Sequence, residues 1–147
     1  MGRKKEVKHY NFESKKEKGA FTKICKDMQT SEAWKALSLR QQGLYLHLKY
    51  KFIKYKTQDT NQYNISIPKS EASQLYGDLR TFRKDIDVLI EKGFIKQITS
   101  GFNTRTVNIY GFTNLWWNYG KEEYNVPNNN RRYIPKIYKS NSKNNLE

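Results

Sequence analysis

The chain has 147 residues, a length that suits one domain with terminal segments. Its 28 lysines and arginines outnumber 14 aspartates and glutamates, which gives a formal net charge of +14. Folding does not require this excess, so it indicates a polyanionic partner, with nucleic acid as the first candidate, anionic membrane as the second and solubility alone as the plain alternative. No apolar run approaches the ~20 residues of a membrane-spanning helix, and no apolar signal core follows the N-terminus.

The cysteine and histidine content argues against a disulfide or a metal centre. Cys25 is the one cysteine, which fits a reducing, cytoplasmic compartment, and we expect it to be a small buried residue. His9 and His47 lack the spacing of metal ligands. Because no paired carboxylates, glycine-rich phosphate loop or nucleophile signature stands out, the sequence predicts a protein that is not an enzyme and binds no cofactor.

Composition divides the chain into three segments. Residues 1–19 are mostly charged and too poor in apolar side chains to offset the entropy of ordering, so we predict a flexible basic arm. Residues 20–120 hold nearly all the large apolar residues and form the predicted domain. Residues 121–147 are predicted to be an extended or disordered tail, in which residues 131–139 interleave basic side chains with tyrosines and isoleucines.

The first half of the domain is expected to hold a strand and two helical segments. Residues 20–26 alternate roughly between apolar and polar, which favours a short strand, and residues 31–37 favour a short helical turn. Ser38 and Gln41 have the spacing of a capping box, in which each side chain satisfies a backbone donor at the helix start. The apolar pattern of residues 44–53 fits a strand or a helix, and the capping box favours the helix.

The second half begins with a polar loop over residues 54–62 and a strand over 63–67. A helix over 69–76 is expected to end at Gly77, where a left-handed residue is favoured. Residues 79–93 are the clearest helix, because apolar residues recur there at three- and four-residue steps while the other face is charged.

Two strands, residues 94–99 and 106–112, follow this helix and are expected to form a hairpin through the polar link 100–105. Residues 114–119 then favour a closing helical turn that packs Trp116 or Trp117 on the core.

The order of helix, glycine-containing turn, longer helix, strand, basic loop and strand is that of a helix-turn-helix followed by a wing. The predicted fold is therefore α+β: a winged helix-turn-helix with a three-helix core, a small antiparallel sheet and a β-hairpin wing. A helix fits the major groove, where its first turns reach base edges, and its free amides favour phosphate. The candidate DNA contacts are Arg80, Thr81, Arg83, Lys84 and Asp87 on the helix, with Asn103, Thr104 and Arg105 on the wing.

Several runs also resemble a known type of protein. They are SEAWKALS at 31–38, IPKSEA at 67–72, IDVLIEKGFI at 86–95 and NIY at 108–110. Over about residues 20–118 the chain resembles winged-helix DNA-binding proteins of plasmids, phages and conjugative elements of low-GC Gram-positive bacteria. The resemblance implies that double-stranded DNA is the partner, in replication, conjugative transfer or transcription control of such an element.

Alternatives stay open at this point. The charged helix face can be a merely solvated surface and the wing a plain hairpin, in which case the module docks a protein partner. Residues 131–139 suit single-stranded nucleic acid or RNA, because bases stack on tyrosine rings. A homodimer, or a complex with other mobile-element proteins, fits a module that reads two half-sites.

Overall fold

The structure, a computed structural model, covers the central part of the chain. The residues that it describes are 21–54, 57, 59–101 and 104–125. The predicted arm, residues 1–19, lies outside them, as do residues 126–147 of the predicted tail and Asn103 of the predicted wing.

Helices precede, interrupt and follow the strands of a small sheet, and the predicted α+β class is confirmed. The elements in chain order are α1 (Lys26–Thr30), α2 (Glu32–Lys35), α3 (Leu39–Tyr50), β1 (Ile65–Ser66), α4 (Lys69–Tyr76), α5 (Leu79–Glu91), β2 (Ile95–Thr99), β3 (Ile109–Phe112) and the 3-10 helix η1 (Leu115–Asn118).

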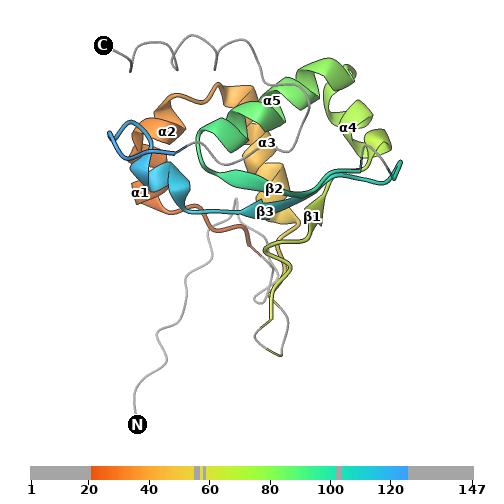
Figure 1. Ribbon diagram of the computed structural model, residues 1–147, viewed down its shortest axis with the longest axis horizontal. Coiled ribbons are helices and arrows are strands. Elements are labelled where there is room, and N and C mark those ends of the chain that lie inside the picture. The colour runs from red at the N-terminus through yellow and green to blue at the C-terminus, as the bar shows by residue number, and fades with distance from the viewer. Residues whose placement is uncertain (1–20, 55–56, 58, 102–103, 126–147) are drawn as a thin grey trace, which may run out of the picture.

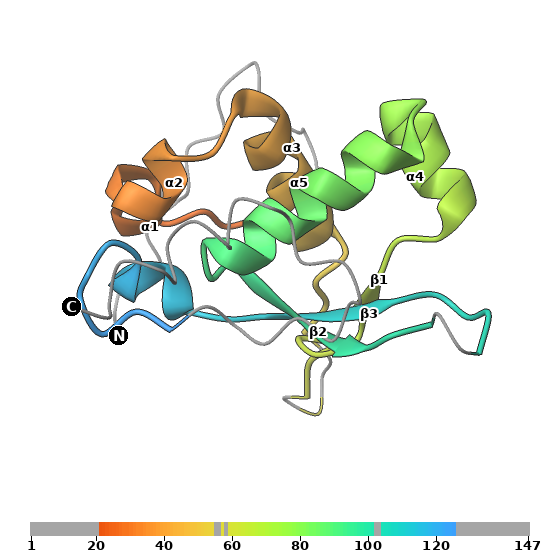
Figure 2. The same ribbon diagram turned by 45° about the horizontal axis from the view of Figure 1, so that its top comes forward.

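The three strands form one antiparallel sheet in the spatial order β1-β3-β2. Ile65 lies opposite Tyr110, and Ile95 lies opposite Phe112. Helices α3 and α5 lie on one face of the sheet, with α1, α2 and η1 at one end of the molecule and α4 at the other (Figure 1, Figure 2). The predicted hairpin of the last two strands is confirmed.

Strand β2 begins one residue later than the sequence predicts, and β1 and β3 are each three residues shorter than predicted. Strand β1 covers only part of the predicted 63–67, because the backbone N–H of Asn64 donates to the carbonyl of Asn61 at 2.9 Å and keeps the preceding residues in a turn. Strand β3 starts late because the Asn108 side chain accepts a hydrogen bond from the backbone N–H of Gly101 at 2.9 Å. This side-chain bond replaces a strand-to-strand bond at the loop end of the hairpin.

Aromatic rings from distant parts of the sequence form the centre of the core. The ring of Tyr45 on α3 lies 5.8 Å from that of Trp34, 5.1 Å from that of Phe94 and 5.8 Å from that of Phe112, measured between centroids. Edge-to-face and tilted contacts of this kind add to the stability gained from burial alone. The core therefore joins α2, α3, the residue before β2 and the end of β3.

The predicted closing turn is confirmed as η1. Trp116 stacks on Phe94 with ring centroids 6.3 Å apart, whereas Trp117 is exposed, so Trp116 is the tryptophan that packs on the core. The chain keeps packing beyond the predicted domain boundary, since the Tyr124 hydroxyl donates to the carbonyl of Glu91 at 2.5 Å.

The helix starts follow the sequence closely. Ser38 Oγ accepts from the backbone N–H of Gln41 at 3.3 Å, and Gln41 Oε1 accepts from the backbone N–H of Ser38 at 2.9 Å. The predicted capping box is thus confirmed at the start of α3. Ser31 caps α2 in the same manner, by accepting from the backbone N–H of Trp34 at 3.2 Å.

Two predictions for the start of the domain are wrong. Of the predicted strand 20–26, the described residues have no regular structure until Lys26 begins α1. Ile24 and Met28 pack on the core, but Thr22 and Lys26, which would share a strand face with them, are exposed. The backbone N–H of Gln29 donates to the carbonyl of Cys25 at 3.2 Å, which is a helical bond that closes the first turn of α1. Cys25 is exposed and not buried, because Ile24 and Met28 take the core-facing positions on either side of it.

Candidate nucleic-acid interface

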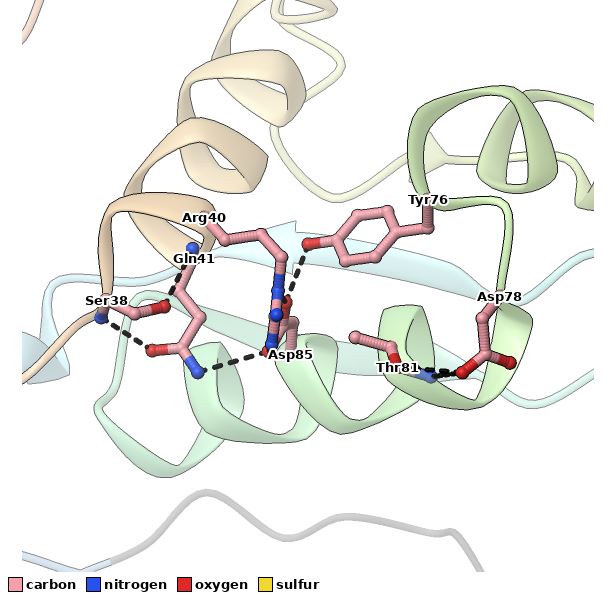
Figure 3. Close-up of polar contacts among 7 residues, drawn as sticks. All are labelled: Ser38, Arg40, Gln41, Tyr76, Asp78, Thr81 and Asp85. Carbon is pink, nitrogen blue, oxygen red and sulfur yellow. Dashed lines mark hydrogen bonds and ion pairs between the residues drawn. The ribbon is translucent and has the colours of Figure 1, made fainter.

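The turn between α4 and α5 sets the start of the candidate reading helix. Gly77 has φ of +68°, in the left-handed region, and its backbone N–H donates to the carbonyl of Ser73 at 2.7 Å. Asp78 then caps α5 (Figure 3), because its carboxylate accepts from the backbone N–H groups of Arg80 at 2.9 Å and Thr81 at 3.2 Å. The Thr81 hydroxyl donates to the same carboxylate at 2.8 Å.

This cap corrects one expectation about phosphate. Two of the backbone amides predicted to be free for phosphate at the helix start already bond to Asp78. The hydrogen bond from the backbone of Arg80, followed by the bond from the Thr81 hydroxyl, lowers the pKa of Asp78, so the cap is a carboxylate at neutral pH. A negative charge there repels phosphate, and a phosphate contact has to come from side chains further along α5.

Those side chains form one cationic face. Arg80, Arg83 and Lys84 are exposed and lie three and four residues apart, which is the spacing of one helix face. Thr81 is half-buried, and Phe82 points the other way, into the core. The first turns of α5 therefore present the predicted cations to solvent and anchor themselves through Phe82.

Asp87 does not belong to this face, and its predicted place there is wrong. It is buried, although its position in the helical pattern puts it among charged residues. The physical reason is that the middle of α5 is buried on more of its circumference than its apolar residues occupy. The buried residues of α5 beyond its first turns are Asp85, Ile86, Asp87, Leu89 and Ile90.

The loop between β2 and β3 carries the remaining predicted contacts. Thr104 and Arg105 are exposed, and Arg105 has φ of +53°, which is uncommon for a residue with a side chain. The hydroxyls of Thr104 and Thr106 lie 2.7 Å apart and bond to each other. This loop lies at the same end of the molecule as α4 and the beginning of α5 (Figure 1, Figure 2).

A polar network that we did not predict from the sequence lies behind the cationic face. Asp85 is 1% exposed, and its carboxylate accepts from Arg40 Nε at 2.5 Å and from Arg40 Nη2 at 3.0 Å. Gln41 Nε2 donates to it at 3.1 Å and the Tyr76 hydroxyl at 2.9 Å (Figure 3). One carboxylate thus ties the first turn of α3 and the last turn of α4 to the middle of α5.

The electrostatics of this network favour a charged carboxylate. Burial alone would raise the pKa of Asp85, but the hydrogen bonds from Arg40, Gln41 and Tyr76 outweigh burial and lower the pKa. Burial, with the Asp85 carboxylate as a second cause, raises the pKa of Tyr76, so its hydroxyl stays a donor. The sequence signal was present: Asp85 interrupts the apolar face three residues after Phe82, and a buried carboxylate requires partners.

A second cluster anchors the other end of α4. Glu71 accepts from Lys51 Nζ at 2.6 Å and lies 2.6 Å from His47 Nε2, while Lys51 also donates to the carbonyl of Ser66 at 2.8 Å. Burial acts to raise the pKa of Glu71, but the bonds from Lys51 and His47 lower it. Helix α4 is therefore fixed at its start to α3 and β1, and at its end to α3 and α5.

Three broader observations apply to the candidate interface. Within the described ranges, histidines, cysteines and carboxylates form no group of three or more that could hold a metal ion. No helix in the described part of the chain has the length and apolar character needed to cross a membrane. No protein-family model, curated protein or solved structure matches the chain.

Proposed function

We propose that the chain is a non-catalytic winged-helix protein that binds double-stranded DNA, with α5 as reading helix and the β2–β3 hairpin as wing. The observation that carries the proposal is the cationic face of Arg80, Arg83 and Lys84 on the first turns of α5. It lies at the same end of the molecule as the loop that carries Arg105 (Figure 2). Two basic elements at one end suit a duplex that meets both at once.

The proposed DNA contacts are of two kinds, contacts to bases and contacts to phosphates. Arginine donates two hydrogen bonds to guanine in the major groove, so Arg80 and Arg83 are the base-reading side chains of the proposal. Lys84 is suited to a neighbouring phosphate, and Arg105 to phosphate or a flanking minor groove. Thr81 is a weaker candidate because its hydroxyl already donates to Asp78.

The proposed task follows from the resemblance of the sequence to winged-helix proteins of mobile elements. Binding to a site on such an element serves its replication, conjugative transfer or transcription control in the cytoplasm. Mapping the bound sites on the element separates these tasks, since an origin of replication, an origin of transfer and a promoter occupy different positions.

Duplex binding is expected to weaken steeply with salt, because lysines and arginines that neutralise phosphates release bound counterions. The loss is about 0.9 in log affinity per tenfold rise in salt for each phosphate contacted. Fluorescence anisotropy of a labelled duplex across a salt series measures it. Absence of duplex binding even at low salt contradicts the proposal, and preferential binding of a single strand or RNA supports the tail-based alternative.

Arg83→Ala is expected to cost about 1–3 kcal/mol of binding free energy and to relax preference at one base position. Arg105→Ala is expected to weaken all duplexes about equally, because a phosphate contact carries no sequence information. Lys26→Ala is the matched control, since it removes the same charge from α1 at the opposite end of the molecule. Titrations with preferred and scrambled duplexes, alongside melting curves, test this. If Arg83→Ala behaves like Lys26→Ala, α5 is not the reading helix.

A further inference from the structure

The outer face of the sheet, turned away from α3 and α5, carries an aromatic ring in a fixed place. Figure 2 shows α3, α4 and α5 on one side of the sheet and none of the labelled helices on the other. In β3 the buried residues Tyr110 and Phe112 face the helices, so Gly111 between them faces outward. A Cβ atom on Gly111 would lie 2.7 Å from Cδ1 of Tyr63 and 3.1 Å from Cδ1 of Ile98. The ring of Tyr63 therefore occupies the space that a side chain at position 111 would fill.

A lysine lies beside this ring. Lys96 is opposite Gly111 in the neighbouring strand β2, and its Nζ is 5.0 Å from the centroid of the Tyr63 ring. A cation at this distance is attracted to the face of the ring. In the part of the chain that the structure describes, Lys96 forms no ion pair with a carboxylate. Tyr63 is 54% exposed, so the ring and the cation are both open to a partner from outside.

The charge around the ring suits an anion. Strands β1, β2 and β3 contain Lys96 and no carboxylate. From Lys92 to Lys121 the sequence has lysines and an arginine but no aspartate or glutamate. A nucleic acid strand offers, in each of its units, a flat base that can stack on a tyrosine and a phosphate that can bind a lysine. One nucleotide therefore complements both groups of this surface.

We propose that the outer face of the sheet binds single-stranded DNA, with a base stacked on Tyr63 and the adjacent phosphate bound by Lys96. A single strand is needed, because the faces of the bases in a duplex are covered by their neighbours. DNA is favoured over RNA, because Ile98 and Gly111 beside the ring offer no side-chain hydrogen bond to a ribose 2′-hydroxyl, and burying that group without a partner is unfavourable. The surface lies across the sheet from α5, so it is separate from the proposed duplex interface.

Fluorescence anisotropy of a labelled oligodeoxyuridylate with the full chain tests the stacking contact. Tyr63→Ala is expected to raise the dissociation constant about fivefold or more, which corresponds to the loss of one stacked base. Tyr63→Phe keeps the ring and is expected to bind like wild type. Tyr50→Ala is the matched control, because Tyr50 is 77% exposed on α3, across the sheet from Tyr63. The proposal is overturned if no single strand binds at low salt, or if Tyr63→Ala binds it as well as Tyr50→Ala does.

A salt series tests the phosphate contact. Lys96→Ala is expected to reduce the slope of log affinity against log salt by about 0.7, the value for one phosphate of a single strand. Lys26→Ala, which removes the same charge from α1, is expected to leave the slope unchanged. A slope that Lys96→Ala also leaves unchanged overturns the phosphate contact.

Competition tests the choice of DNA. Unlabelled oligouridylate of the same length has the same bases and differs only in its 2′-hydroxyls, so it is expected to displace the DNA less well than unlabelled oligodeoxyuridylate does. Displacement by the RNA that is as good or better overturns the choice of DNA.

Titration of the same variants with duplex DNA separates the two surfaces. Tyr63→Ala is expected to bind duplex like wild type, whereas Arg83→Ala is expected to lose duplex affinity and to keep its affinity for the single strand. An equal loss of both affinities in Tyr63→Ala overturns a separate single-strand surface. Failure of single-strand binding leaves the proposed duplex binding intact, and the converse also holds. Melting curves establish that each variant is folded.

Discussion

Arg40→Ala is expected to lower the free energy of unfolding by about 3–5 kcal/mol, which is the cost of leaving a buried carboxylate without its ion partner. Asp85 is the buried member of the pair, at 1% exposed, whereas the Arg40 side chain is 58% exposed. Truncating Arg40 removes the ion partner and leaves the Asp85 carboxylate with the hydrogen bonds from Gln41 and Tyr76 alone. Urea denaturation at neutral pH measures the loss.

Two further variants separate the ion pair from mere packing. Arg40→Lys keeps the charge but not the two-pronged contact, so a smaller loss is expected. Adding Asp85→Asn to Arg40→Ala removes the stranded charge and should restore part of the stability. A double variant less stable than Arg40→Ala alone would show that the carboxylate is not the source of the penalty.

The pH dependence of the same pair has a defined sign. The pKa of Asp85 is lowered in the folded chain, so the pair stabilises the fold above the ordinary aspartate pKa. This contribution is lost as the pH falls through the lower folded-state pKa. The wild-type advantage over Arg40→Ala is therefore expected to shrink in strong acid.

Phe82→Ala is expected to destabilise the fold by about 3–5 kcal/mol, the range for truncating a buried phenylalanine. Phe82 is buried on α5 and meets the Tyr76 ring of α4 edge-on, with centroids 5.5 Å apart. Removing it opens a cavity between α4 and α5, the helix that carries the proposed cationic face. Thermal and urea unfolding measure the loss.

Leu75→Ala serves as the control for Phe82→Ala. It truncates a large apolar side chain of α4 that is exposed, so the expected change is within about 0.5 kcal/mol. Equal losses for the two variants would contradict the assignment of Phe82 to the core.

Local signals account for the parts of the fold that were predicted correctly. Helix α5 was predicted from the apolar residues that recur at Phe82, Ile86 and Leu89. Apolar residues three and four positions apart identify one face of a helix, so the pattern can be read from the local sequence alone. The start of α3 follows from Ser38 and Gln41, which satisfy each other's backbone donors without help from the rest of the chain.

The features that were predicted wrongly or not at all depend on contacts between distant segments of the chain. Cys25 lies at the start of a five-residue helix too short to show a pattern, and the core position of Met28 decides its exposure. Asp87 has the sequence environment of a solvated residue, but its burial depends on what encloses α5. The partners of Asp85 come from α3 and α4, so the network exists only once three helices have met.

The strand order has a consequence for how the protein is made. Strand β1 pairs with β3 and not with β2, the next strand in the sequence. Ile65 therefore has no strand partner until Tyr110 has been synthesised. Tyr45 likewise lacks its contact with Phe112 until the end of β3 has been synthesised. A nascent chain on the ribosome therefore carries an unfinished core for most of its translation, and non-local closure of this kind is slow and exposes apolar surface. Products that terminate before β3 are expected to become substrates for chaperones and proteases, not shorter working proteins.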